Sequence, residues 1–156
     1  MKYCNILLST LATVMTLTGI MPCGACAADA VRAASLGHNK ANAHRVYEEG
    51  LNLGRFEVPY SPGFVGHDST STFTHANGMA EVKGFRKALP DLRVTVDNTL
   101  AERDLAAVHW TARGTSTGTG LGFPATGRAV QVTGTTLFRM ADGRIAEEWM
   151  CATRTG

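Results

Sequence analysis

Residues that could transfer a proton are concentrated in one predicted strand near the end of the chain, residues 144–153. Side chains alternate between the two faces of a strand. An isoleucine and a tryptophan on one face predict that this face is buried, and Glu147 would be carried inward between them. Burial disfavours a charged carboxylate and raises its pKa toward values that suit proton transfer. The residues on this face are Ile145, Glu147, Trp149, Cys151 and Thr153.

Three roles remain open for Glu147. It could act as a general base, line a pocket without chemistry, or form a structural ion pair with Arg113 or Arg139. The neighbours on its face would extend the site along the strand. We therefore predict that Trp149, Cys151 and Thr153 contact a ligand.

A second candidate for proton transfer is His67, which follows a predicted edge strand and adjoins Asp68. Imidazole titrates near neutral pH and is therefore suited to acid–base work. A neighbouring carboxylate could orient the ring, so Asp68 is placed with the ligand-contacting residues. The alternative is a loop histidine that is hydrogen-bonded to the backbone.

The predicted strand 105–113 alternates in the same way. Val108, Trp110 and Ala112 share one face, so Trp110 is either a core residue or a ring that contacts the ligand. His109 then faces solvent or a partner subunit.

Ser116 lies in a segment rich in glycine and threonine, residues 114–127, which is predicted to form a lid or hairpin loop. No Gly-x-Ser-x-Gly elbow surrounds it, so we expect ligand contact and not a nucleophile. The glycines do not follow a phosphate-loop pattern. The histidines are scattered without a His-x-x-x-His pair, and no metal site is predicted.

The N-terminal residues 1–27 are predicted to be a secretory signal peptide. Lys2 is the only charge, residues 6–21 are almost continuously apolar, and Ala25-Cys26-Ala27 supplies a cleavage site. A retained anchor is one alternative, although the apolar run is short for a membrane span. A lipoprotein with Cys26 as the lipidated residue is another. The signal peptide predicts a periplasmic or secreted protein.

The rest of the chain suits one domain. Residues 28–37 are predicted to be a flexible leader remnant, and residues 38–156 the folded domain. The net charge of the 156-residue chain is +2, and no basic cluster indicates a nucleic-acid partner. Cys151 is the only cysteine outside the predicted leader, so no intramolecular disulfide is expected. We expect no membrane contact beyond the signal peptide.

Two helices are predicted, followed by a series of long strands. The first runs from an Asn39 cap to about residue 53, and the second begins near Asn77 and ends before Pro90. Between them, residues 57–64 are read as a loop leading to a short edge strand. Alternating runs then cover residues 92–97, 105–113, 128–139 and 144–153. The pair Asp142-Gly143 indicates a tight hairpin turn. This order predicts an α+β fold in which a curved antiparallel sheet packs on the helices and encloses a pocket. Gly134, in mid-strand, is a candidate position for a bend.

Several short motifs, taken in order, resemble the SnoaL-like ester cyclases of the NTF2-like superfamily. The resemblance covers residues 39–149 and also includes Phe64, Gly66 and His67. Its motifs are Leu-Pro-Asp-Leu (89–92), Ala-Val-His-Trp (107–110), Gly-Thr-Ser-Thr-Gly (114–118), Gly-Phe-Pro-Ala-Thr-Gly-Arg (122–128), Phe-Arg (138–139) and Asp-Gly-Arg-Ile (142–145).

The resemblance implies an NTF2-like cone that binds a small apolar or carbonyl-bearing ligand and performs acid–base chemistry without metal or organic cofactor. It places His67 at the pocket mouth and implies a homodimer through the outer sheet face. The chain departs from the family at three positions associated with the pocket or its chemistry. Ser116 and Glu148 each stand where the family commonly has histidine, and Thr153 stands where it has a catalytic aspartate. A non-catalytic binding or dimerisation module is the alternative function.

Overall fold

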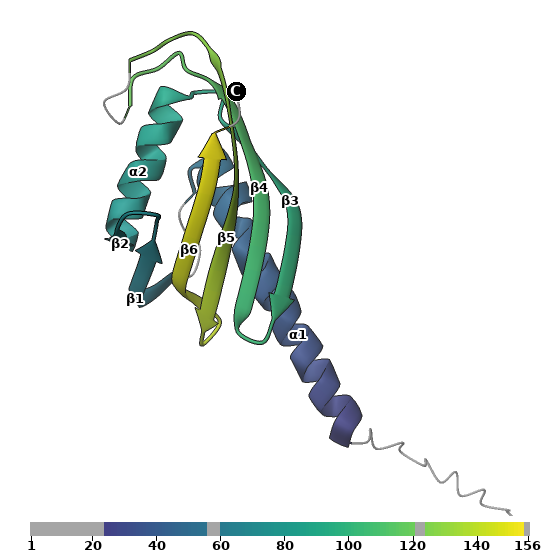
Figure 1. The fold of residues 1–156 in the computed structure, drawn as a ribbon. Coiled ribbons are helices and arrows are strands. Elements are labelled where there is room, and N and C mark those ends of the chain that lie inside the picture. Colours follow the sequence, from purple (N-terminus) through teal and green to yellow (C-terminus); the bar gives the residue numbers. More distant parts are fainter. Residues whose placement is uncertain (1–23, 56–59, 121–123, 155–156) are drawn as a thin grey trace, which may run out of the picture.

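The computed structural model describes residues 24–55, 60–120 and 124–154. A six-stranded sheet carries two helices on one of its faces (Figure 1). The strands are ordered β2-β1-β6-β5-β4-β3 across the sheet. In chain order the elements are α1 (Gly24–Arg45), a π-helical segment (Val46–Leu51), β1 (Tyr60–His67), β2 (Thr72–Thr74), α2 (His75–Ala88), β3 (Arg93–Glu102), β4 (Leu105–Thr115), β5 (Ala129–Ala141) and β6 (Arg144–Arg154).

The first helix begins earlier than the sequence indicated. α1 includes residues 28–37, which were predicted to be flexible, and its first turns project from the body of the molecule (Figure 1). Alanine, which is abundant there, has the highest helix propensity of all residues. Asn39 therefore lies inside the helix and does not cap it; its buried amide donates to the carbonyl of Arg103 at 3.0 Å. The predicted signal peptide lies mostly outside the described residues.

The second helix agrees with the prediction. Thr74 is its N-cap and accepts a hydrogen bond from the backbone N–H of Asn77. The helix ends at Ala88, close to Pro90, which cannot continue a helix.

The sheet is mixed, whereas the sequence predicted an antiparallel one. Strands β3 to β6 form the predicted antiparallel meander. β1, however, pairs parallel to β6, and the short β2 forms the edge beside it. The hairpin between β5 and β6 turns at Asp142 and Gly143, whose φ angles of 50° and 71° match the turn that the sequence predicted.

The side of the sheet that faces the helices, called here the inner face, carries the core. Val108, Phe138 and Ile145 from β4, β5 and β6 are fully buried. Ala43 from α1 and Tyr47 from the π-helical segment pack against them. Burial of Val108, Phe138 and Ile145 contributes roughly 1.5–3 kcal/mol of hydrophobic stabilisation for each side chain.

A β-bulge in β6 changes which residues face inward. Ile145 pairs with Met140 and Glu147 with Arg139, so Ala146 has no partner on β5. An extra residue in one strand shifts the alternation of side chains by one position. Ile145 therefore faces inward before the bulge, and Glu148 faces inward after it, opposite the buried Phe138.

Gly134 is required by packing between neighbouring strands. It lies opposite Trp110 in the β4–β5 ladder, and a Cβ atom there would overlap the indole ring of Trp110. The glycine lets the large ring lie flat on the inner face at this point.

Candidate active site

An apolar cavity of about 260 Å³ lies between the π-helical segment, α2 and the inner face of the sheet. Aromatic and aliphatic side chains form most of its wall, as is usual for small-molecule sites. A few polar groups interrupt this wall. The polar residues among those that line it are Tyr47, Tyr60, His75, Glu81, Trp110, Thr136 and Glu148.

The carboxyl group of Glu148 is the most unusual of these groups. Within the described part of the chain it makes no hydrogen bond and no ion pair. Burial raises its pKa from an ordinary 4.5 to about 7. An unpaired buried carboxyl is unfavourable for folding, so its presence in a ligand-sized cavity is typical of a functional group.

Three further residues with polar groups, Tyr47, Trp110 and Thr136, line the same cavity as Glu148. Trp110 donates its indole N–H to the hydroxyl of Thr136 at 3.1 Å, and the ring of Tyr47 packs beside that of Trp110, with ring centroids 6.0 Å apart. All three side chains are buried. Burial raises the pKa of Tyr47 and that of Tyr60, and the nearby negative charge of Glu148 acts in the same direction on both.

His75 lies at the start of α2 and packs on Tyr60, with ring centroids 4.3 Å apart. Its Nε2 is buried and has no hydrogen-bond partner among the described residues. Burial lowers the pKa of this histidine, which favours the neutral ring.

Glu147 and His67, the two predicted proton-transfer residues, lie in contact with each other, but on the outer face of the sheet. His67 Nε2 lies 2.9 Å from Glu147 Oε1, and Arg139 donates from Nε and Nη2 to Oε2 at 2.9 and 2.8 Å. The ring of His67 stacks on that of Trp149 at 5.2 Å with an interplanar angle of 4°. Neither Glu147, His67 nor Trp149 lines the cavity.

The prediction that Glu147 and the residues after it face inward was therefore wrong, because the bulge reverses the alternation of side chains along β6 after Ile145. Arg139 forms the ion pair that was one of the three roles considered for Glu147. The hydrogen bond from His67, and then those from Arg139, lower the pKa of Glu147 instead of raising it. Cys151 and Thr153 follow on the outer face, opposite Thr135 and Thr133, and both are exposed.

Asp68 and Ser116, the two predicted site residues in loops, form hydrogen bonds within those loops. Asp68 accepts hydrogen bonds from the backbone N–H groups of Thr70 and Ser71 in the β1–β2 turn, which lowers its pKa to about 2. Ser116 pairs through its backbone with Arg128 and Thr126 across the β4–β5 loop. Neither Asp68 nor Ser116 lines the cavity.

Trp110 is the predicted site residue that does line the cavity. Sequence reasoning missed Glu148, Tyr47 and His75. The available signal was the family resemblance, which already associated position 148 with the pocket or its chemistry. Tyr47 lies within the helix predicted from Asn39 to about residue 53, and no site role was predicted for it.

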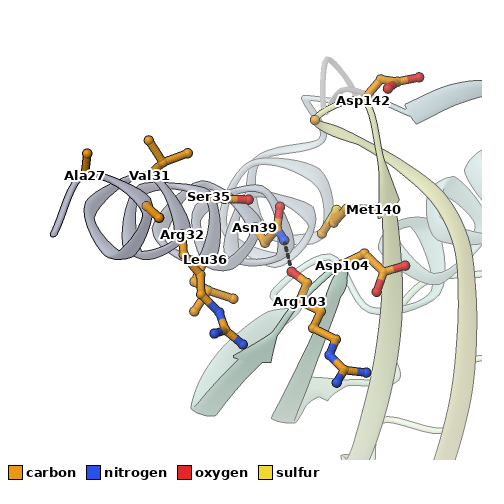
Figure 2. A pocket seen from close by; sticks show the side chains of 12 residues that line it. Ala27, Val31, Arg32, Ser35, Leu36, Asn39, Arg103, Asp104, Met140 and Asp142 are labelled. Atoms are coloured by element: carbon orange, nitrogen blue, oxygen red, sulfur yellow. Dashed lines mark hydrogen bonds between the residues drawn. The ribbon is translucent and has the colours of Figure 1, made fainter. Parts of the chain in front are cut away.

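A larger, open groove of about 700 Å³ lies apart from this cavity, beside the N-terminal half of α1 (Figure 2). The β3–β4 turn, with Arg103 and Asp104, and the β5–β6 turn, with Asp142, form its other side. Val31 of α1 is largely exposed there, and Asn39 donates across the groove to Arg103. The groove is less enclosed than the cavity.

The sequence profile of the SnoaL-like polyketide cyclases matches residues 41–156, about three quarters of the chain. The chain belongs to this family. A comparison with curated proteins gave no match.

Solved structures agree with this SnoaL-like assignment. A protein from Jannaschia sp. CCS1, described as a SnoaL-like polyketide cyclase, is 26% identical with a TM-score of 0.66, over 74% of this chain and 85% of that one. IdmH from Streptomyces antibioticus, described as a polyketide cyclase, is 25% identical with a TM-score of 0.65, over 73% and 91%. AclR from Streptomyces galilaeus, described as a hydroxylase, is 25% identical with a TM-score of 0.68, over 76% of each chain.

The fold is therefore the α+β NTF2-like cone that the sequence predicted. Fold alone does not identify the reaction. Among the described residues, no three His, Cys, Asp or Glu side chains gather in a way that could hold a metal ion. None of the helices in that part of the chain is long and apolar enough to cross a membrane.

Proposed function

We propose that this SnoaL-like protein binds a small apolar compound with a carbonyl group and moves a proton on it, with Glu148 as the general base. One observation carries the proposal: an unpaired carboxyl group, with a pKa near 7, in the wall of a ligand-sized apolar cavity. A general base works best when its pKa lies near the working pH. A useful fraction of the molecules then carries the ionised carboxylate, and that carboxylate is still basic enough to accept a proton.

Deuterium exchange tests this proposal without knowledge of the natural substrate. A panel of small enolisable ketones is incubated with the protein in D₂O, and deuterium next to the carbonyl is followed by NMR. We expect exchange above background for at least one ketone, reduced about 100-fold or more in Glu148→Gln. Equal exchange by Glu148→Gln and the unmodified protein would exclude Glu148 as the base.

A non-catalytic binding module is the second candidate. Its support is the cavity lining, most of which is aromatic and aliphatic, with Glu81 and Glu148 as its two carboxyl-bearing residues. Mass spectrometry of the natively purified protein would then find a bound apolar compound, and the panel would show no exchange. Exchange that disappears in Glu148→Gln argues against this function.

Export is part of the same proposal. Residues 1–27 are proposed to direct the protein to the periplasm or the medium, with cleavage after Ala27. Cell fractionation followed by intact-mass analysis tests this, since the exported form should begin at Ala28. A lipidated Cys26 would identify a lipoprotein instead, and an uncleaved chain in the cytosol would contradict export.

We also propose a homodimer through the outer face of the sheet. Three large apolar side chains are exposed on this face: Leu100 at 73%, Val65 at 39% and Trp149 at 37%. Exposed apolar side chains gathered on one face are typical of interaction sites. Light scattering at micromolar concentration should give the mass of a dimer, and Trp149→Lys should shift it toward the monomer. A monomeric mass for the unmodified protein would contradict this.

A further inference from the structure

The inward-facing side of α1 continues beyond the body of the molecule. Asn42 and Ala43 are buried near the end of the helix that covers the sheet. Residues three, four or seven positions apart share one side of a helix, so Ser35 and Val31 lie on the same side as Asn42. Val31 is nevertheless 71% exposed, because this part of α1 projects past the sheet (Figure 1). The projecting half therefore carries its inward-facing side over the open groove and not over a core.

Two buried amides fix the direction in which α1 projects. Asn39 donates to the carbonyl of Arg103 in the β3–β4 turn, and Asn42 donates to that of Gly143 in the β5–β6 turn, both at 3.0 Å. The two asparagine side chains are buried. Separation of the helix from the turns would leave these groups without partners, at a cost of about 1–3 kcal/mol each. The groove between the helix and the two turns is therefore a fixed feature of the fold.

The charges around the groove divide into a basic side and an acidic side. Arg32 and Arg103 extend to one side of it, Asp142 lies on the other, and Asp104 lies between (Figure 2). None of these four side chains forms an ion pair with another described residue. A groove with one basic and one acidic side is complementary in charge to a second copy of itself turned by a half-rotation.

We propose that the groove receives the projecting half of α1 from a second copy of this chain. The two helices lie antiparallel, and each covers the apolar wall of the other copy's groove, which includes Leu36 and Met140. The basic side of one copy, with Arg32, faces the acidic side of the other, with Asp104. Such a contact is isologous, because each copy presents the same surface that it receives. Recognition follows the helix-in-groove mode.

The composition of the helix favours a second copy over a membrane or a small ligand. Asp29 and Arg32 are the only charged side chains in residues 24–37. Helices that lie on membranes carry many lysines and arginines on their polar face, which this segment lacks. Sites for small ligands enclose most of the ligand's surface, whereas this groove is open. A second helix, in contrast, needs an open groove.

This contact uses a different surface from the two sites already proposed. α1 lies on the inner side of the sheet (Figure 1), whereas the proposed homodimer uses the outer face around Trp149. No residue that lines the groove also lines the cavity of Glu148. Each of the three proposals can therefore fail without the others.

Photo-crosslinking identifies what occupies the groove. Full-length chain with p-benzoylphenylalanine at position 31 is mixed in unlabelled and ¹⁵N-labelled forms, irradiated and analysed by mass spectrometry. We expect peptides that join the two labels and link position 31 to α1, or to the turns at Arg103 and Asp142, of the other copy. The same reagent at position 33, which does not line the groove, should give no such peptides. Links from position 31 to residues 1–23 of the same chain would assign the groove to the leader and overturn the inference.

Sedimentation measures the strength of the contact. Trp149→Lys is the background, because it removes the proposed outer-face contact and leaves α1 unchanged. We expect this variant to dimerise at concentrations well above micromolar, since small interfaces bind weakly. Val31→Glu added to it should raise the dissociation constant at least about tenfold, because the new carboxylate would be covered without a partner. Ala33→Glu introduces the same charge outside the groove and should leave the constant unchanged.

Charge reversal tests the choice of a second copy as the partner. Arg32→Glu and Asp104→Lys should each weaken the dimer, and the double variant should recover part of the loss, because opposite charges face each other again. All of these positions are exposed, and an unchanged Tm shows that the fold is intact. No mixed-label peptides, equal association of Val31→Glu and Ala33→Glu, or no recovery in the double variant would each overturn the inference.

Discussion

Glu147 and Glu148 are adjacent in the chain and have opposite environments. Glu147 lies on the outer face of the sheet, where hydrogen bonds from His67 and Arg139 lower its pKa. Glu148 lies in the cavity, where burial without a partner raises its pKa to about 7. The comparison shows that the face of the strand, and not the residue type, decides which carboxyl group can accept a proton near neutral pH.

The largest effect should appear in the pH dependence of catalysis. Exchange by the unmodified protein should rise roughly 50-fold between about pH 5 and pH 7, because the ionised fraction of a group with a pKa near 7 rises by that factor. Glu147→Gln should leave the midpoint in place. Rates measured across this pH range for both proteins check the prediction, and a midpoint that moves with Glu147→Gln would reverse the roles of the two carboxyl groups.

A smaller but distinct effect is expected on stability. The pKa of Glu148 is raised in the folded state, so the folded protein binds more protons than the unfolded one between about pH 4.5 and 7. The contribution of Glu148 to the unfolding free energy is then complete below about pH 4.5 and falls as the pH rises to about 7, by roughly 3 kcal/mol in total. Urea unfolding at several pH values should show this fall in the unmodified protein.

Glu148→Gln is the matched variant, since it keeps the shape and cannot ionise. Its unfolding free energy should lack the decline between about pH 4.5 and 7. A parallel decline in both proteins would assign the effect to another group.

The smallest effect is expected for the outer carboxyl group. The pKa of Glu147 is lowered by its partners, so its contribution to stability is present above about pH 4.5 and is lost as the pH falls below that value. Exposed ion pairs contribute little, so Glu147→Gln should lower the Tm by a few degrees at most at neutral pH. Below about pH 4.5 the Tm of Glu147→Gln should equal that of the unmodified protein. A large loss at neutral pH would show that the His67–Glu147–Arg139 network is more than a surface feature.

Much of the fold could be predicted from the sequence, because its signals are local. The alternation of β4, β5 and β6, the Asp142-Gly143 turn and the end of α2 before Pro90 each depend on nearby residues. The parallel pairing of β1 with β6 could not be predicted in the same way. It joins segments about 80 residues apart, and Tyr60 and His67 carry no local sign of their partner strand.

The candidate site was predicted only in part. His67 and Glu147 do come together, and Trp110 does face the cavity. The face of β6 was inverted because both alternating sets of that strand contain apolar residues: Ile145 and Trp149 on one, Ala146 and Met150 on the other. Hydrophobic alternation alone cannot choose between two such sets.

The sequence by itself determined that β6 would present two adjacent glutamates to opposite faces, since side chains alternate along any strand. Only the tertiary structure decided which glutamate enters the cavity. That choice depends on Ala146, which stays unpaired because Met140 and Arg139 of β5 take Ile145 and Glu147 as partners. Pairing between strands is set by the whole sheet, and one unpaired residue is enough to turn Glu148, and not Glu147, toward the cavity.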